Sequence, residues 1–267
     1  MSDRERVEKQ AEAAERRYEE DSLMLKKRQE EYKTIEEVFD RPTLQGVFKL
    51  IHQKIIDEIF GVIKAGKEAR IYWGKDFEGT DLAIKIYYTS TAEFRKGMMQ
   101  YIQGDPRFKR VRKSPRGIIY TWTQKEYKNL QLVEAAGVNA PRPIAFQSNI
   151  LVMTFIGEDG VPAPLLREEA PLDPVQFYSK LLDEMKLMYT KAGLVHGDLS
   201  EYNIMVWEES PVIFDVSQAL LISHPLADTL IQRDITNVNS YFKKLDIETY
   251  DPDNVEPWIK GESEILS

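Results

Sequence analysis

The 267-residue sequence predicts an α+β fold with two lobes. Short apolar segments at 62–73 and 82–87 have the composition of strands and precede an amphipathic helical segment at 121–133. A second strand pair, at 204–207 and 212–214, follows in the C-terminal half. With 42% hydrophobic residues the chain can bury a substantial core, and 30% charged residues indicate a soluble protein.

The N-terminal region is dominated by charge. Residues 1–42 are rich in Glu, Lys and Arg and predict a solvated helical extension outside the core. Apolar residues then recur at helical spacing from Val47, so we expect a helix that ends near Phe60 and packs on the first lobe. We place the first lobe at residues 43–153 and the second at 154–267.

The segment 62–73 predicts two strands joined by a turn of small and charged residues, Gly66, Lys67, Glu68 and Ala69. Backbone N–H groups in such a turn can approach phosphates. One glycine is weak evidence, because a plain hairpin turn looks much the same. Lys67 and Glu68 either contact phosphate or lie on the surface.

Lys85 lies inside an apolar strand, where an ordinary lysine would extend its charge to the surface. A phosphate site needs such a cation and a carboxylate to position it. Glu126 on the amphipathic helix is the candidate, with Glu134 as the alternative. The simpler interpretation pairs Glu126 with a neighbouring lysine on a solvated helix face.

The most informative stretch is His196-Gly-Asp-Leu-Ser-Glu-Tyr-Asn203, followed by Asp215 after the second strand pair. Phosphoryl transfer needs one carboxylate to orient the nucleophile and oxygen ligands to hold Mg²⁺, or Mn²⁺, against the triphosphate. Asp198 suits the first role, and Asn203 and Asp215 suit the second. Each of them alone is more often a loop-capping residue. Together, at the end of a hairpin, they predict a phosphoryl-transfer site.

These parts follow one another in the order found in protein kinases. The chain resembles the RIO family of atypical serine protein kinases, in particular its type-one subfamily in an archaeal-like form. The resemblance covers roughly residues 45–245 and rests on the following motifs: Gly66-Lys-Glu-Ala69, Ala83-Ile-Lys85-Ile-Tyr87, Lys125-Glu126-Tyr-Lys-Asn-Leu130, His196-Gly-Asp-Leu-Ser-Glu-Tyr-Asn203 and Ile213-Phe-Asp215-Val-Ser-Gln218.

The resemblance implies a protein-kinase-like fold, with an antiparallel sheet plus helix in the first lobe and a mostly helical second lobe. Lys85 would anchor the α- and β-phosphates of ATP against Glu126, and His196 would support the catalytic loop. Met153 would be the gatekeeper, with the backbone of Thr154 and Ile156 presented to adenine. Many members carry Glu at position 154, and a backbone contact makes this difference unimportant.

Departures from ordinary protein kinases limit the expected substrates. Gly197 replaces the arginine that usually precedes the catalytic aspartate. Asp215-Val-Ser replaces Asp-Phe-Gly, and a helix is expected from about Leu226 to Leu245. This truncated second lobe leaves little room for an activation segment or a peptide platform, so we expect a narrow protein substrate range.

The long interval at about 88–118 is expected to be a flexible loop, with its most basic stretch at 109–116. That stretch is either a solvated loop without a role, or a contact to RNA such as rRNA. As members of the family autophosphorylate on serine, Ser114 is a candidate acceptor, with Ser90 and Ser2 as alternatives.

The resemblance implies an ATP- and Mg²⁺-dependent kinase, with an alternative ATPase cycle through an aspartyl phosphate on Asp215. It also implies a small ribosomal subunit precursor as partner. Two other classes stay open: a small-molecule phosphotransferase of the aminoglycoside or choline kinase type, and a catalytically quiet ribosome-assembly scaffold. The former usually carries a larger C-terminal lobe.

Composition excludes several classes. A net charge of −8 opposes wholesale nucleic-acid binding, and the absence of cysteine excludes disulfides and suits a reducing cytoplasm. No apolar run approaches the roughly 20 residues of a membrane span, and the N-terminus does not resemble a secretory signal. We therefore expect a cytoplasmic protein without a membrane partner.

Overall fold

The computed structural model describes residues 39–89, 92–108 and 114–264, and the chain comprises two units, Met1–Phe48 and Lys49–Ser267. Most of the expected N-terminal extension, residues 1–42, therefore lies outside the described residues. Helix α2, Arg41–His52, begins after Asp40, whose carboxylate accepts hydrogen bonds from the N–H and hydroxyl of Thr43 at 3.1 and 2.6 Å.

The prediction that this helix continues to Phe60 is wrong. Strand β1 starts at Glu58, and the Asp57 N–H already donates to the Lys75 carbonyl at 2.8 Å. The isoleucines of this stretch are β-branched, and they fit a strand at least as well as a helix. Their spacing alone did not distinguish the two.

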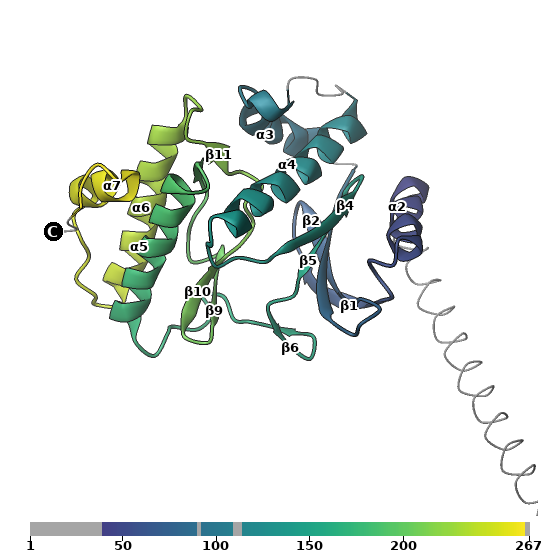
Figure 1. Ribbon diagram of the computed structural model, residues 1–267, viewed down its shortest axis with the longest axis horizontal. Helices are drawn as coiled ribbons and strands as arrows, with labels where there is room; N and C mark the ends of the chain where they lie inside the picture. The colour runs from purple at the N-terminus through teal and green to yellow at the C-terminus, as the bar shows by residue number, and fades with distance from the viewer. Residues whose placement is uncertain (1–38, 90–91, 109–113, 265–267) are drawn as a thin grey trace, which may run out of the picture. The chain divides into compact units, whose positions relative to one another are not determined.

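The first lobe is a five-stranded antiparallel sheet in the order β1-β2-β3-β5-β4 (Figure 1). Its strands are β1 (Glu58–Ala65), β2 (Ala69–Lys75), β3 (Asp81–Tyr87), β4 (Pro143–Gln147) and β5 (Ile150–Thr154). The central strand β3 is buried along nearly its whole length. The side chain of Lys85 is therefore enclosed between the sheet and helix α4 (Pro115–Ala135), which carries Glu126.

The interval 88–118, expected to be a loop, contains regular structure. Helix α3 spans Ala92–Ile102, a 3₁₀ turn, η1, spans Pro106–Phe108, and helix α4 spans Pro115–Ala135 with Ser114 as its N-cap. Met98 and Ile102, one turn apart, pack with Trp122 in a separate apolar cluster. Burial of these apolar side chains explains why the interval forms helices rather than a loop. Residues 109–113 of the predicted basic stretch, with Ser90 and Ser2, lie outside the described residues.

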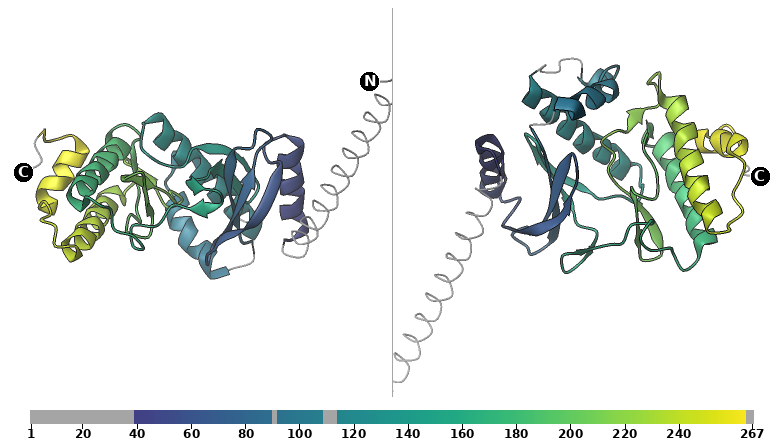
Figure 2. Two further views of the ribbon diagram at one scale, coloured as in Figure 1. Left: turned by 90° about the horizontal axis from the view of Figure 1, so that it is seen from below. Right: turned by 180° about the vertical axis from the view of Figure 1, so that it is seen from behind.

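The second lobe is mostly helical, as predicted (Figures 1 and 2). Its helices are α5 (Pro174–Thr190), α6 (Ala227–Lys244) and α7 (Pro252–Lys260), and its short strands are β6 (Gly157–Glu158), β7 (Val161–Pro162), β8 (Leu194–Val195), β9 (Ile204–Trp207), β10 (Ser210–Ile213) and β11 (Leu220–Leu221). Helix α5 is capped by Asp173, whose carboxylate accepts from the Gln176 N–H at 2.9 Å.

One apolar core links the two lobes. It includes Ala83, Leu151 and Met153 of the sheet together with buried residues of α5, α6 and α7. Such a shared core fixes the sheet relative to the helices, which the site between them requires.

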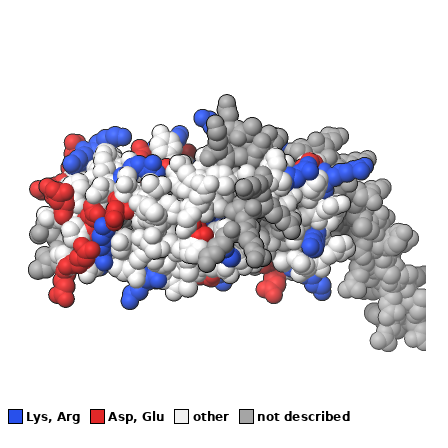
Figure 3. All heavy atoms as spheres, turned by 90° about the horizontal axis from the view of Figure 1, so that it is seen from above, with Lys and Arg blue, Asp and Glu red and all other residues white. Residues whose placement is uncertain are grey.

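On the face in Figure 3, acidic side chains gather toward the α6 and α7 end. Within the described ranges, no helix is long and apolar enough to cross a membrane.

Leu181→Ala in α5 tests this core. Leu181 is fully buried, so its truncation is expected to lower the free energy of unfolding by about 2 to 5 kcal/mol. Val175→Ala on the same helix is the control, because Val175 is 61% exposed and should change stability by less than about 0.5 kcal/mol. Urea unfolding measures both, and similar effects would contradict the described core.

Candidate active site

The site is organised around the ammonium group of Lys85. Its Nζ donates hydrogen bonds to Glu126 Oε1 at 2.7 Å and to Asp215 Oδ1 at 2.8 Å, and the Tyr87 hydroxyl donates to the other Glu126 oxygen. Burial lowers the pKa of Lys85, but the carboxylates of Asp215 and Glu126 outweigh it and hold that pKa well above its ordinary value. Lys85 therefore stays charged, and Glu134, the alternative partner, lies exposed on α4.

The β9–β10 hairpin brings the predicted metal ligands together. Ile204 pairs with Ile213, and the Phe214 N–H donates to the Asn203 carbonyl at 3.1 Å. Asp215 follows immediately with a φ of 59°, a left-handed conformation that non-glycine residues adopt at a cost. The turn places its carboxylate against Lys85, with Ser217 Oγ donating to the same oxygen at 2.9 Å.

Asp198 lies beside these residues on the catalytic loop. The Asn203 amide donates to the Asp198 carbonyl at 2.8 Å, and Gln218 Nε2 donates to the Asp198 carboxylate at 3.2 Å. Burial raises the pKa of Asp198 above its ordinary value. A carboxylate with a raised pKa is a better proton acceptor. Sequence reasoning did not identify the contact from Gln218.

Both ring nitrogens of His196 contact backbone groups and so support the catalytic loop, residues 196–203. Its Nε2 lies 3.0 Å from the Phe214 carbonyl, and its Nδ1 accepts the Asp198 N–H at 3.3 Å. These contacts assign the neutral tautomer with the proton on Nε2. His196 is buried at 2% exposure, so its ring holds the catalytic loop against the strand that leads to Asp215.

Asp234 on α6 holds the same loop from the other side, and sequence reasoning missed it. Its carboxylate accepts the Gly197 N–H at 2.7 Å and the Leu199 N–H at 2.9 Å. The available signal was an acidic residue between Ile231 and Ile235 on the apolar face of a helix. Burial raises the pKa of Asp234 to about 6.

The turn at 66–69 approaches the site through Glu68. The Gly66 N–H donates to the Ala69 carbonyl at 2.9 Å and closes the turn, where Lys67 is exposed. Burial and then the Asp215 carboxylate raise the pKa of Glu68 to about 7, with Glu126 and Asp198 acting in the same direction. Several carboxylates thus face one lysine, an arrangement that favours an added cation.

The residues fit Mg²⁺. The Asn203 nitrogen donates to the Asp198 carbonyl, and Lys85 and Ser217 donate to one Asp215 oxygen. Within the part of the chain that the structure describes, the Asn203 oxygen and the second Asp215 oxygen remain available to a metal. Among the described residues no three His, Asp or Glu side chains form a metal cluster. Mg²⁺ is commonly held by one or two carboxylates with phosphate and water, so a smaller protein ligand set suffices.

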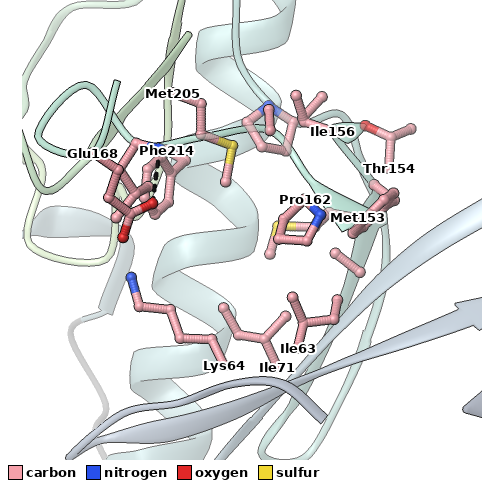
Figure 4. Close-up of a pocket in the computed structure, with 15 residues that line it drawn as sticks. Ile63, Lys64, Ile71, Met153, Thr154, Ile156, Pro162, Glu168, Met205 and Phe214 are labelled. Carbon is pink, nitrogen blue, oxygen red and sulfur yellow. Dashed lines mark hydrogen bonds between the residues drawn. The ribbon is translucent and has the colours of Figure 1, made fainter. Parts of the chain in front are cut away.

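An apolar cavity of about 250 Å³ adjoins this charged site. Figure 4 shows the side chains of Met153, Thr154 and Ile156 on one side of the cavity, with the Lys64 and Glu168 side chains opposite. The remaining lining comes from both lobes: Ile63, Ile71, Ala83, Pro141, Phe155, Pro162, Ala163, Leu165, Met205 and Phe214. Such a slot suits a flat, largely apolar group.

Thr154 has a structural role of its own. Its hydroxyl accepts the Arg142 N–H at 2.9 Å, and its own N–H donates to the Arg142 carbonyl at 2.9 Å. The hydroxyl therefore replaces a missing backbone pairing beside β4.

The last predicted position is Ser114, whose side chain accepts the Gly117 N–H at 3.1 Å as the cap of α4. A phosphate there would sit at a helix N-terminus.

Sequence similarity to known proteins indicates the family of this chain. A sequence model described as the RIO domain matches residues 70–255. The chain belongs to the RIO family. A RIO-type serine/threonine-protein kinase Rio1 of Methanocaldococcus jannaschii is 41% identical over 80% of this chain and 73% of its own length. Another Rio1 of that description, from Haloferax volcanii, is 34% identical over 87% of this chain and 79% of its own length.

The structural comparison supports the fold of this RIO kinase. The Rio2 kinase from Chaetomium thermophilum, in an ADP/Mg²⁺-phosphoaspartate complex, aligns with a TM-score of 0.63 at 21% identity, over 82% of this chain and 65% of that one. The RIO relatives establish serine/threonine kinase activity of the atypical type, and their name Rio1 agrees with the type-one resemblance.

The raised pKa of Asp234 predicts a pH-dependent stability. Because its folded pKa of about 6 exceeds its ordinary 3.8, the free energy of unfolding is expected to fall as pH rises from about 4 to about 6, by on the order of 2 to 3 kcal/mol. Asp234→Asn removes this component. Urea unfolding at several pH values measures it, with Asp183→Asn, at an exposed position of α5, as control. A difference between wild type and Asp234→Asn that stays constant with pH would contradict the assignment.

Proposed function

We propose that this RIO kinase transfers the γ-phosphoryl group of ATP to serine, including serine of its own chain, with Mg²⁺ or Mn²⁺ as the metal. The observation that carries the proposal is the shared Lys85 ammonium between Glu126 and Asp215, next to an apolar cavity. Few other chemistries need a fixed cation, an open carboxylate oxygen and a flat apolar slot side by side.

Each residue has a separate task in this reaction. Adenine occupies the cavity against Met153 and meets the backbone of Thr154 and Ile156. Lys85 contacts the α- and β-phosphates while Glu126 retains it. Asp215 and Asn203 would hold the metal, whose charge would neutralise that of the phosphates.

Asp198 orients the acceptor hydroxyl and takes its proton as the oxygen attacks the γ-phosphorus and ADP leaves. Its carboxylate is positioned for this by Gln218, and its loop by Asp234. These two contacts restrict the carboxylate before a substrate arrives, which reduces the ordering that the reaction requires.

An ATPase cycle on Asp215 is the second candidate. Only residues 216–226, which include β11, separate Asp215 from α6, so a platform for a separate protein acceptor has little room. An Asp215 oxygen would attack the γ-phosphorus with loss of ADP, and water would then cleave the acyl phosphate to release phosphate. The Rio2 complex named above contains a phosphoaspartate, which makes this mode worth testing here.

We also propose a small ribosomal subunit precursor as the partner, on the basis of the family resemblance. Co-sedimentation of the full chain with precursor particles tests it, with and without ATP and Mg²⁺. Binding should change between the two conditions, and migration apart from the particles in both would refute this partner.

Labelling with γ-labelled ATP and Mg²⁺ tests the reaction. The wild type should acquire acid-stable label on serine, and Asp198→Asn should lower the rate by about 10²- to 10⁴-fold because the proton acceptor is lost. Lys85→Met and Asp215→Asn should each abolish labelling. The control is Asp183→Asn, which removes an exposed carboxylate of α5 and should leave the rate unchanged.

The other outcomes separate the alternatives. Phosphate release without acid-stable label favours the cycle on Asp215. Label transferred to an aminoglycoside or to choline would replace the protein kinase assignment. If neither the wild type nor the variants acquire label or release phosphate, the catalytically quiet scaffold is favoured.

A further inference from the structure

Helix α4 carries two fully buried polar side chains that the mechanism above does not use. Lys125 and Asn129 lie one turn apart, each with 0% exposure. Lysine is rarely buried so completely unless its charge or its donors are matched. Both side chains are matched by one short segment of the second lobe.

That segment, residues 216–219, is here called the metal loop because it directly follows Asp215. Lys125 Nζ donates to the Ser217 carbonyl at 2.9 Å and also to the Ala219 carbonyl. Asn129 Nδ2 donates to the Val216 carbonyl at 2.8 Å and to the Ala219 carbonyl at 3.0 Å. Four hydrogen bonds from one helix thus fix the backbone of this loop.

The same helix holds Asp215 by a second route. Glu126, next to Lys125, binds Lys85, and Lys85 binds the Asp215 carboxylate. Asp215 is therefore restrained through its side chain by Glu126 and through the following backbone by Lys125 and Asn129. Both restraints act on a residue whose φ of 59° is a left-handed conformation that non-glycine residues adopt at a cost.

Asn129 is itself held in place. Its Oδ1 accepts from Arg107 Nη2 at 2.8 Å, and the Arg107 guanidinium also binds the Asp105 carboxylate, at 2.6 Å for the shortest contact. This contact selects the amide orientation in which Nδ2 faces the metal loop. The turn before α4 thereby contributes to the order of the loop.

We propose that Lys125 and Asn129 are positioning residues, which fix the metal-binding Asp215 and keep α4 in the arrangement that joins Glu126 to Lys85. In this chain they take the place of an activation segment, for which the short connection to α6 leaves little room. The inference rests on the proposed ATP and Mg²⁺ chemistry. The Lys125 amine can donate both bonds whether or not it is protonated, so the restraint does not depend on its charge.

ADP binding by calorimetry, with and without Mg²⁺, tests the proposal on the full chain. In the wild type Mg²⁺ should strengthen ADP binding. Lys125→Met and Asn129→Leu should reduce this strengthening by about 10-fold or more while metal-free ADP binding, which uses the apolar cavity, stays within about 2-fold. The Mg²⁺ concentration for half-maximal autophosphorylation should rise in parallel.

Thr123→Val is the matched control. Thr123 is equally buried on α4, but its hydroxyl donates to the Ile119 carbonyl of the same helix at 3.0 Å rather than to the metal loop. Its loss should leave the Mg²⁺ effect intact. Asn129→Asp is the variant for the case in which Asn129→Leu does not fold, because it keeps an oxygen for Arg107 and removes the donors to the loop.

The outcomes are distinct. A wild type that binds ADP equally well without Mg²⁺ would overturn the proposed function and this inference with it. A wild-type Mg²⁺ effect that folded Lys125→Met and Asn129→Asp both retain would overturn the inference alone. An equal loss in Thr123→Val would also overturn it, since any buried polar change in α4 would then suffice.

Discussion

The buried ammonium of Lys85 is the constraint on which the rest of the structure depends. A lysine with 6% exposure is tolerated only with charged partners, and its two carboxylates come from positions 126 and 215. Strand β3, helix α4 and the turn after β10 must therefore meet at one point. The shared apolar core of the two lobes supplies the driving force that brings them there.

Charge and shape are divided between two neighbouring regions of the site. The apolar cavity selects a flat group by its dimensions and offers few polar contacts. The carboxylates beside the cavity repel an anion such as phosphate unless a cation binds together with it. A nucleotide with its metal satisfies both regions at once, whereas neither region alone specifies it. This division explains why an acidic site can be proposed to bind a triphosphate.

The parts of the fold whose signals are local were predictable from the sequence. The lysine strand and the hairpin with Asn203 and Asp215 each depend on a short run of residues, and the structure contains both of them. Asp234, Lys125 and Asn129 were missed because their partners are distant in the sequence and are backbone groups, which carry no residue signature. The interval 88–118 was misjudged for a related reason, since α3 depends on packing against Trp122.

The most direct measurement is a crystal structure with a non-hydrolysable ATP analogue and Mg²⁺. The account predicts adenine in the cavity beside Met153, Mg²⁺ on Asp215 and Asn203, and Lys85 turned from Asp215 to the phosphates while its contact with Glu126 persists. Metal bound away from both residues, or Lys85 still bound to Asp215 with the phosphates elsewhere, would contradict it.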